Sequence, residues 1–389
     1  MKIVVKKYGG TSVASVSKIQ QIAKQLSFDI HKGESIVVVV SAMGKTTDEL
    51  FNLAYSITSQ PNQREMDMLL TAGERITMAL LSLSLEKLNI QSISFTGSQS
   101  GIITDNSHGN AKILRVNAFR ILEELKKNKI VIVAGFQGVS TDKEITTLGR
   151  GGSDTTAVAL GCFLKAIKCE IFTDVDGVYQ IDPNKYSQGK IIEHLSYEEM
   201  MYLSYTGAKI LHYRAAEFAY KYRVPIEIKN SNVNTCDAVP NQLSTYIGDA
   251  MEKSEVNAIS YKENILIFRV KTAFIPKFNT ELIDFQFSSK SNCLELYIEN
   301  NNKENLSSEL IKNDLTFSID ENEYIIINLL GFRIHKDISF LNVLQDLLSK
   351  SCKEPFTIYN QGIGVQIVTY HSESNNVIQT IINNIMEVT

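Results

Sequence analysis

The sequence lacks the cysteine and charge patterns of several large protein classes. Its Cys residues, at 162, 169, 236, 293 and 352, form no Cys-x-x-Cys pair, which argues against a disulfide framework or a zinc ribbon and favours a reducing cytoplasm. The 39 Lys plus Arg residues face 43 Asp plus Glu residues, a formal net charge of −4, so no general basic surface for nucleic acid is expected. The His residues show no metal-ligand spacing, and we assign no metal site.

Long hydrophobic runs are also missing. No stretch reaches the roughly 18 consecutive apolar residues typical of a membrane-spanning helix. The N-terminal MKIVVKKYGG reaches Gly9 before a signal-peptide-like segment can form. We therefore expect a soluble, cytoplasmic protein without a membrane partner. A length of 389 residues predicts two or three domains.

Glycine is scarce in the last third of the chain. Of 21 Gly residues, 18 lie at or before Gly248. Glycine permits positive φ angles and close backbone approach to a ligand, so the glycine-rich part is where a site built from main-chain amides is expected. More frequent turns would be the alternative explanation. The change from STYIGDA to the charged MEKSEV marks a boundary, and we predict domains at 1–250 and 251–389.

The first part alternates predicted strands and helices. Residues 3–7 and 35–40 are β-branched runs, and between them a helical pattern places Ile19, Ile22, Ala23 and Leu26 on one face. Further predicted elements are helix 64–88, strand 91–95, helix 110–127, strand 129–134, helix 153–165, strand 169–173, helix 207–220 and strand 225–228. This order predicts an α/β fold with a mainly parallel sheet between helices. Ligands of such sheets bind beyond the carboxyl ends of the strands.

Two loops that follow predicted strands are rich in glycine. The segment Lys7-Tyr8-Gly9-Gly10-Thr11-Ser12 opens a helix and is suited to hold phosphate with main-chain amides and a lysine. A tight turn followed by a helix cap would give the same sequence pattern. Gly149-Arg150-Gly151-Gly152-Ser153-Asp154 also opens a helix. Capping would explain Ser153 or Asp154, but an Arg among three glycines favours binding of an anionic substrate.

A third loop, TDVDGVYQIDP at 173–183, contains a fragment of a calcium-binding pattern. An EF-hand needs a third ligand and a closing Glu at positions where this chain has Val178 and Lys185. A calcium site is therefore excluded. The turn is compatible with a nucleotide base stacked beside Tyr179.

Together with SAMGKTT at 41–47, GER at 73–75, GFQGVSTDKEITTLGRGGSDTTAVAL at 135–160 and GAKILH at 207–212, these motifs resemble aspartate kinases of the amino-acid kinase family. The resemblance spans residues 2 to about 230. It implies a three-layer kinase domain that uses ATP with Mg²⁺ to convert L-aspartate to 4-phospho-L-aspartate, the entry to lysine, threonine and methionine synthesis. No general base is required for this reaction because a carboxylate is already nucleophilic near neutral pH.

The resemblance also implies residue roles. Lys7 and Lys209 would contact the phosphates, Asp154 would orient Lys7, Glu74 would face the substrate ammonium group and Arg150 its carboxylate. The other expected aspartate contacts are Ser41, Thr47 and Ser153, and the other expected nucleotide contacts are Gly9, Gly10, Ser12, Thr173, Asp174, Tyr179 and Asp182. Taken alone, Glu74 in a helix would normally lie on a solvated face, and Ser41 and Thr47 would normally be caps.

Two positions depart from the family pattern. Asn184 and Lys185 follow Asp-Pro where the family commonly has Arg, and Tyr213 stands where it often has Pro. The first departure bears on nucleotide affinity rather than on reaction type.

From about residue 256, aspartate kinases usually carry two ACT modules, each βαββαβ, which bind regulatory amino acids and dimerise. The second module is predicted as strand 323–330, helix 337–350, strands 355–359 and 363–368, and helix 374–386. Between strand 264–270 and the run at 282–287, about ten residues leave too little room for a loop and a helix of three turns. We therefore expect the first module to be degenerate and feedback inhibition by lysine or threonine to be weak, lost or altered, in a homodimer.

Two other functions remain open at this stage. A non-catalytic amino-acid sensor would be marked by loss of Lys7, Glu74, Arg150 or Asp154, and none is lost. A kinase for another acidic amino acid is the second alternative. Fusion to a dehydrogenase is not indicated, because the run at 361–367 lacks the third glycine of a dinucleotide fingerprint.

Overall fold

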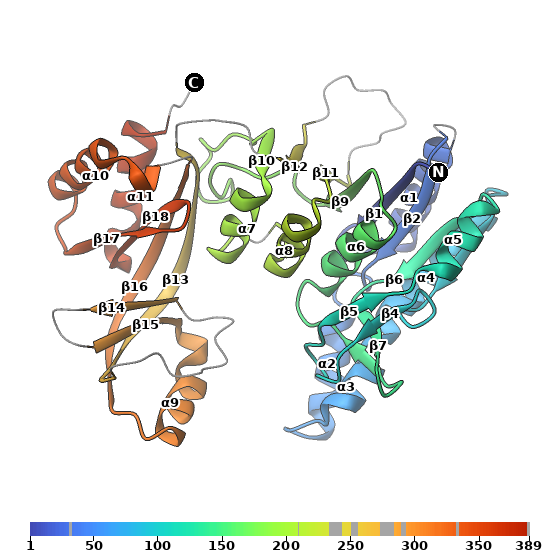
Figure 1. The fold of residues 1–389 in the computed structure, drawn as a ribbon, viewed down its shortest axis with the longest axis horizontal. Helices are drawn as coiled ribbons and strands as arrows, with labels where there is room; N and C mark the ends of the chain where they lie inside the picture. The colour runs from blue at the N-terminus through green and yellow to red at the C-terminus, as the bar shows by residue number, and fades with distance from the viewer. Residues whose placement is uncertain are drawn as a thin grey trace. The chain divides into compact units, whose positions relative to one another are not determined.

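The computed structural model describes residues 1–30, 33–208, 210–232, 243–249, 256–272, 284–288, 293–331 and 334–386. The chain forms two compact units (Figure 1). The first comprises Met1–Tyr179, Lys190–Tyr205 and Lys209–Met251, and the second comprises Gln180–Gly189, Thr206–Ala208 and Glu252–Thr389. Two short segments that lie far upstream in the sequence are thus part of the second unit.

A mainly parallel sheet forms the centre of the first unit. Its strand order is β10-β12-β11-β9-β1-β2-β6-β3, and only the pairing of β11 with β12 is antiparallel. Burial of every residue in β1 and β6 is typical of strands covered by helices on both faces. The strands are β1 (Ile3–Tyr8), β2 (Ser35–Val40), β3 (Ser92–Phe95), β6 (Ile130–Ala134), β9 (Lys168–Thr173), β10 (His194–Ser196), β11 (Ile226–Asn230) and β12 (Thr245–Gly248).

Helices cover the two faces of this sheet. On one face, α1 and α4 pack their apolar sides together with Tyr8 and Val38. On the other face, α6 contacts β1 and β9 and also packs against α8. The helices of this unit are α1 (Val16–Ile30), α2 (Thr46–Ile57), α3 (Gln63–Leu70), α4 (Ala72–Glu86), α5 (Phe119–Lys126), α6 (Gly152–Phe163), α7 (Tyr197–Tyr205) and α8 (Tyr213–Tyr222). The predicted α/β architecture is confirmed.

Three helix predictions need correction, and helix α2 was missed. The stretch predicted at 64–88 is two helices, because α3 ends and α4 begins at Thr71. Helix 110–127 is wrong in its first half, where β-branched Ile113 and Val116 belong to strand β5. Helix 207–220 begins only at Tyr213, since the chain turns at Gly207 with φ +119°. Helix α2 was not predicted, because Ala54 is its only buried residue and gives no apolar periodicity.

Strand β5 belongs to a small sheet beside the main one. Its order is β5-β4-β7-β8, with β4 (Ile102–Thr104), β5 (Ile113–Val116), β7 (Gln137–Ser140) and β8 (Ile145–Thr147). Strand β7 follows the main-sheet strand β6 closely, and β8 precedes α6, so this sheet carries the segment that leads into the Gly149–Gly152 loop.

Within the described part of the chain, one helical stretch meets the length and composition criteria of a membrane span. It is Gln63–Glu86, with 44% of its most apolar window buried inside the protein. A core helix of a soluble protein meets the same criteria, so this stretch is weak support for membrane insertion.

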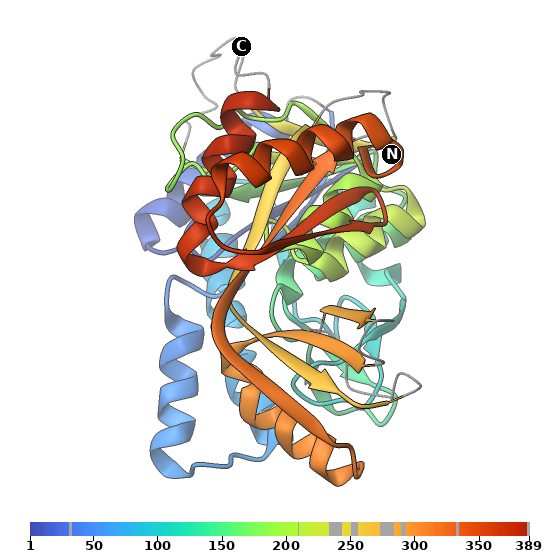
Figure 2. The same cartoon turned by 90° about the vertical axis from the view of Figure 1, so that its left-hand side faces the viewer.

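The second unit is built on one antiparallel sheet with the order β14-β15-β13-β16-β18-β17. Strands β13 (Val256–Val270) and β16 (Phe317–Gly331) run through its middle, and Figure 2 shows the long course of β16. The remaining elements are β14 (Asp284–Ser288), β15 (Cys293–Glu299), α9 (Lys303–Lys312), α10 (Ile338–Ser351), β17 (Phe356–Gln361), β18 (Gly364–Tyr370) and α11 (Ser374–Asn384), with short 3₁₀ turns at Asn300–Asn302, Ile334–Lys336 and His371–Glu373.

Each half of this sheet has the strand order of a βαββαβ module. One half orders its strands β14-β15-β13-β16, and the other β17-β18-β16-β13, so the two modules share both long strands. The predicted strands and helices of the second module are confirmed within a few residues, except that its first strand begins earlier, at Phe317. The expected shortening of the first module's first helix falls on residues 273–283, which lie outside the described residues.

Candidate active site

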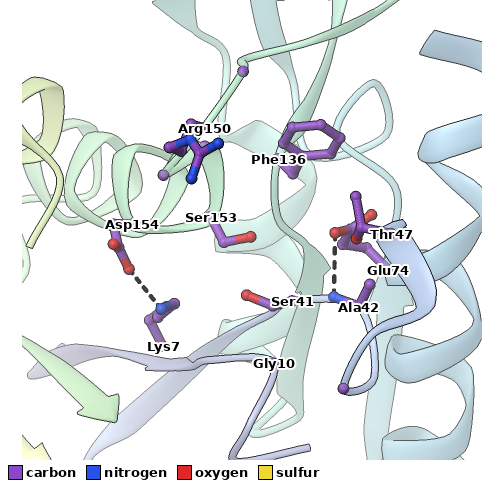
Figure 3. A pocket seen from close by; sticks show the side chains of 14 residues that line it. Lys7, Gly10, Ser41, Ala42, Thr47, Glu74, Phe136, Arg150, Ser153 and Asp154 are labelled. Carbon is purple, nitrogen blue, oxygen red and sulfur yellow. Dashed lines mark hydrogen bonds and ion pairs between the residues drawn. The ribbon is translucent and has the colours of Figure 1, made fainter. Parts of the chain in front are cut away.

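The loops that follow four parallel strands meet at one edge of the main sheet. The amide of Gly9 donates to Phe172 O at 3.3 Å, that of Ser41 to Tyr8 O at 3.1 Å, and that of Gly135 to Val40 O at 3.0 Å. These bonds join the ends of β9, β1, β2 and β6 in order. Beyond them lies a cavity of about 250 Å³ (Figure 3), lined by Lys7, Gly10, Ser41, Ala42, Gly44, Thr47, Glu74, Phe136, Gly149, Arg150, Gly151, Gly152, Ser153 and Asp154.

Lys7 is the lysine that faces this cavity. Neighbouring residues of a strand point to opposite faces, so Lys6 and Lys7 have different surroundings. Lys6 is ion-paired within the core, 2.5 Å from Glu170 and 3.1 Å from Asp29. The Nζ of Lys7 lies 2.6 Å from Asp154 Oδ1, on the first turn of α6 (Figure 3). This distance is compatible with the predicted orientation of Lys7 by Asp154, which stays a prediction.

Glu74 is buried instead of lying on a solvated face. It is only 3% exposed, and its Oε1 accepts a hydrogen bond from the Ala42 amide at 3.1 Å. Its Oε2 has no hydrogen-bond partner among the described residues. Burial raises the pKa of Glu74 to about 7, against the opposing effect of the backbone hydrogen bonds it accepts. Among the described residues, the second oxygen of this carboxylate therefore has no cation at hydrogen-bond distance.

The glycine loop before α6 carries Arg150 over the cavity. Gly149 and Gly151 have φ angles of +75° and +68°, a left-handed backbone that glycine adopts without steric cost. Gly151 is the N-cap of α6, and no side chain caps this helix. The capping explanation for Ser153 and Asp154 is therefore wrong. Ser153, Ser41 and Thr47 line the same cavity, and no side chain caps α2 either.

The expected nucleotide contacts lie mostly beside this cavity. Of them, Lys7 and Gly10 line it. At Gly9, an added Cβ would be 3.3 Å from Lys7 Nζ, so the missing side chain leaves that amine open. Ser12 Oγ donates to Ser231 Oγ at 2.9 Å, and the Ser231 amide donates to Thr173 O at 2.8 Å, which joins two expected contacts at the ends of β1 and β9.

Other expected nucleotide contacts are less closely grouped. Thr173 Oγ1 donates to Asp174 at 3.1 Å, and the Tyr179 hydroxyl donates to Asp176 at 3.4 Å. Asp182 belongs to the second compact unit. Lys209 lies outside the described residues.

Some lining residues were missed by the sequence reasoning. Ala42, Gly44 and Phe136 were part of recognised motifs but received no role. Phe136 has a φ of +68°, and its ring would be 2.8 Å from a Cβ at Gly152. The available signal was its place directly after a buried strand, where sheets of this class bind ligands. Among the described residues, no group of three or more His, Cys, Asp or Glu side chains is placed to hold a metal ion.

Fold and site together define a class. A parallel sheet with a lysine, paired glycines and a helix N-terminus at its carboxyl edge is suited to bind phosphate, and the facing Glu74 and Arg150 are suited to a zwitterionic small molecule. Residues 2–230 match the model of the amino acid kinase family. The chain therefore belongs to the amino acid kinase family.

Individual proteins similar to the chain are aspartokinases. The chain is 53% identical over 234 residues to an aspartokinase of Geobacillus stearothermophilus, which covers 60% of this chain and 58% of that protein. It is also 53% identical over 231 residues to aspartokinase 2 of Bacillus subtilis, covering 59% of this chain and 57% of the relative. The match thus spans less than two thirds of these relatives' length.

Solved structures resemble the whole chain. The structure of E. coli aspartokinase III in complex with aspartate and ADP covers 98% of this chain and 99% of its own, with a TM-score of 0.81 and 21% identity, which shows a shared fold. Aspartate kinase from Synechocystis covers 98% of this chain and 68% of its own, with a TM-score of 0.57 and 28% identity.

Proposed function

We propose that this protein is an aspartate kinase, which transfers the γ-phosphoryl group of ATP to the side-chain carboxylate of L-aspartate. The observation that carries the proposal is the composition of one cavity: the Lys7–Asp154 pair next to glycine backbone, with the buried Glu74 and Arg150 at the same cavity. The similarity to the aspartokinase of G. stearothermophilus supports the same activity. The E. coli structure in complex with aspartate and ADP supports the pair of ligands.

The acceptor would bind through its two backbone charges. The free Oε2 of Glu74 is suited to receive an ammonium group, because a buried carboxylate is stabilised by a cation at hydrogen-bond distance. Arg150 would bind the α-carboxylate, for which its planar guanidinium offers paired donors. Ser41, Thr47 and Ser153 supply hydroxyl groups around the remaining part of the cavity. The side-chain carboxylate is left to act as nucleophile.

Phosphoryl transfer then depends on alignment and on charge neutralisation. Lys7 is held by Asp154 at 2.6 Å and would neutralise charge on the transferred group, while the Gly9 and Gly10 amides would hold the phosphates. Magnesium carried by the nucleotide would supply further positive charge between the phosphates. Ser12, Thr173, Asp174, Tyr179, Asp182 and Lys209 remain the proposed nucleotide contacts.

The second unit is proposed to be regulatory. Its two interleaved βαββαβ modules have the strand order expected of ACT modules, which supports a role in dimerisation and in binding an amino-acid effector. The structure of E. coli aspartokinase III in complex with lysine and aspartate supports lysine as the first effector to test. A cytoplasmic location, together with a place in lysine, threonine and methionine synthesis, belongs to the same proposal.

The proposed function is tested by measuring which amino acid accepts the phosphoryl group. ADP release would be measured with ATP, Mg²⁺ and either L-aspartate, L-glutamate or no amino acid. We expect release that depends on L-aspartate, and trapping of the acyl phosphate with hydroxylamine would identify the product. Greater release with L-glutamate would replace the proposed acceptor, and no stimulation by either would favour a non-catalytic sensor.

A further inference from the structure

Arg214 is a buried cation that connects two loops behind the cavity. It lies on α8, is 8% exposed, and does not line the cavity. Its guanidinium donates to Asn110 Oδ1 at 2.9 Å, to Ala111 O at 2.7 Å and to Leu148 O. All three acceptors are neutral oxygen atoms. Since Leu148 directly precedes Gly149, one side chain ties the 109–111 loop to the start of the glycine loop.

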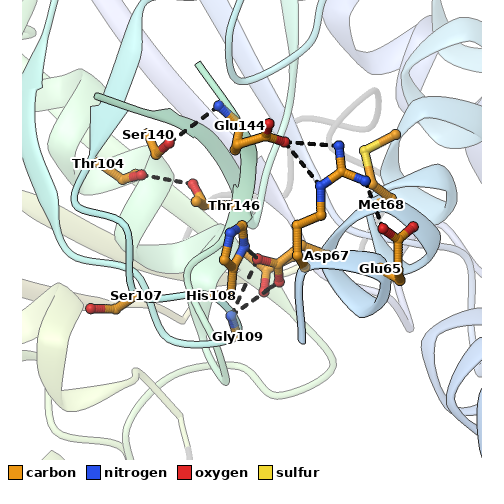
Figure 4. A network of polar contacts seen from close by, with 12 residues as sticks. Glu65, Asp67, Met68, Thr104, Ser107, His108, Gly109, Ser140, Glu144 and Thr146 are labelled. Carbon is orange, nitrogen blue, oxygen red and sulfur yellow. Dashed lines mark hydrogen bonds and ion pairs between the residues drawn. The ribbon is translucent and has the colours of Figure 1, made fainter. Parts of the chain in front are cut away.

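Asp67 connects the same two segments from the other side. This carboxylate on α3 is 0% exposed (Figure 4). Its Oδ1 accepts from Thr147 Oγ1 at 2.5 Å and from the Gly109 amide at 3.1 Å, and its Oδ2 lies 2.6 Å from His108 Nδ1. A buried carboxylate is tolerated only when such bonds satisfy it.

The glycine loop rests directly on the segment that these two residues hold. A Cβ added at Gly149 would lie 2.8 Å from Asn110 Oδ1 and 3.2 Å from Gly109 O. In addition, the Ala111 amide donates to Thr147 O at 2.8 Å. The backbone that carries Arg150 therefore packs against Gly109 and Asn110, and Arg214 and Asp67 fix that packing through bonds to Leu148 and Thr147.

We propose that Asp67 and Arg214 are positioning residues that set the place of Arg150 in the cavity. The identity of the ligand that Arg150 binds, the carboxylate of an acidic amino acid, rests on the proposed function. The positioning itself rests on the hydrogen bonds above. Displacing Arg150 weakens binding of the acceptor and leaves in place the Lys7–Asp154 pair, whose carboxylate belongs to the first turn of α6.

Two conservative variants test the proposal. Asp67→Asn keeps the side-chain shape but turns one acceptor into a donor that faces other donors. Arg214→Lys keeps the charge but cannot reach three acceptors at once. For both we expect the KM for L-aspartate to rise about 10- to 100-fold, with kcat and the KM for ATP changed less than about threefold. If Asp67 and Arg214 had a structural role only, the variants would be less stable, but the KM for L-aspartate would not change more than the KM for ATP.

The control is Arg64→Met. Arg64 lies on the same helix as Asp67, but it is exposed and pairs with Glu65 at 2.7 Å and Glu144 at 2.9 Å. We expect its kinetic constants to match those of the wild type. If Asp67→Asn does not fold, Thr147→Val removes one donor to Asp67 with little change of shape and takes its place.

Hydrogen exchange separates this proposal from the proposed function. In both variants the amides of residues 145–153 should exchange faster than in the wild type, whether or not the enzyme phosphorylates L-aspartate. Wild-type exchange in this segment in folded variants would overturn the positioning role, as would an unchanged KM for L-aspartate in an active enzyme. An inactive wild type with faster loop exchange in the variants would refute only the proposed function.

Discussion

At the scale of single residues, Lys7 is the group on which the proposed chemistry most depends. Its amine faces the cavity and is held 2.6 Å from Asp154, whereas the adjacent Lys6 is committed to ion pairs in the core. Lys7→Ala should lower kcat by roughly 100- to 1,000-fold, the usual effect of removing one donor that stabilises transition-state charge. Steady-state ADP release measures this. Lys45→Ala, an exposed lysine near the same loops, is the control, and equal loss in both variants would contradict the assignment.

Glu74 makes substrate binding dependent on pH. Because burial raises its pKa to about 7, the free enzyme protonates Glu74 as the pH falls below that value and loses the charge that attracts an ammonium group. The kcat/KM for L-aspartate should therefore rise between about pH 6 and 8. In Glu74→Gln it should be lower and should lose this rise. Glu49→Gln, an exposed carboxylate of α2, should keep the wild-type profile.

The raised pKa of Glu74 also affects the stability of the protein. Stability should fall as the pH rises, whereas kcat/KM should rise. The folded state holds the Glu74 proton up to about pH 7, whereas the unfolded chain loses it near 4.5, so stability falls as pH rises between these values. Glu74→Gln removes this loss. At pH 8 it should be more stable than the wild type, by on the order of 2–3 kcal/mol, with no gain below about pH 4.5. Thermal unfolding at the two pH values measures this, and a less stable variant at pH 8 would contradict it.

At the scale of elements, the start of α6 allows a test with two matched glycines. Gly151 and Gly33 both have left-handed backbones, with φ angles of +68° and +75°. A Cβ at Gly151 would lie 2.2 Å from the His212 side chain, whereas one at Gly33 would meet no atom within 4 Å. Gly33→Ala should cost about 1 kcal/mol, the backbone penalty alone. Gly151→Ala should cost more and raise the KM for L-aspartate, and equal effects in both would show that the His212 contact is unimportant.

Sequence patterns predicted elements where burial follows a regular period. Strands β1, β2 and β6 are β-branched and buried, and α1 buries the four predicted residues Ile19, Ile22, Ala23 and Leu26. Helix α2 was not predicted because Ala54 is its only buried residue. The strand β5 was mistaken for helix because its four residues, Ile-Leu-Arg-Val, are too short a pattern to distinguish the two structures, and its pairing with β4 is a tertiary contact.

The residues of the candidate site also differ in how well the sequence predicts them. The resemblance to aspartate kinases predicted that Lys7, Ser41, Glu74 and Arg150 share a site, and all four line one cavity. Arg214 and Asp67 were not predicted, because their partners are 41 to 104 positions away in sequence and, apart from Thr147 at the end of β8, lie in loops without periodicity. Contacts of this kind are set by the packing of loops, which residue spacing does not encode.

At the scale of the whole molecule, the segment that follows Tyr179 is built into the second unit. Its Ile181 and Tyr186 are buried in a core with α10 and α11, and Gln180 O accepts from the Ile259 amide at 2.6 Å. The same segment carries Asp182, a proposed nucleotide contact. Loosening this segment from the second unit should therefore weaken nucleotide binding and leave acceptor binding unchanged.

Two isoleucines of the same core test this coupling. Ile181 and Ile382 are each 2% exposed in one cluster, and only Ile181 lies in the 180–189 segment. Truncation of either to Ala should destabilise the protein by roughly 2–5 kcal/mol, seen as a lower Tm. Ile181→Ala should in addition raise the KM for ATP, with the KM for L-aspartate unchanged, because it frees the segment that bears Asp182. An ATP KM raised equally by Ile382→Ala would assign the effect to general loosening of the unit, and an unchanged ATP KM in both would remove Asp182 from the nucleotide site.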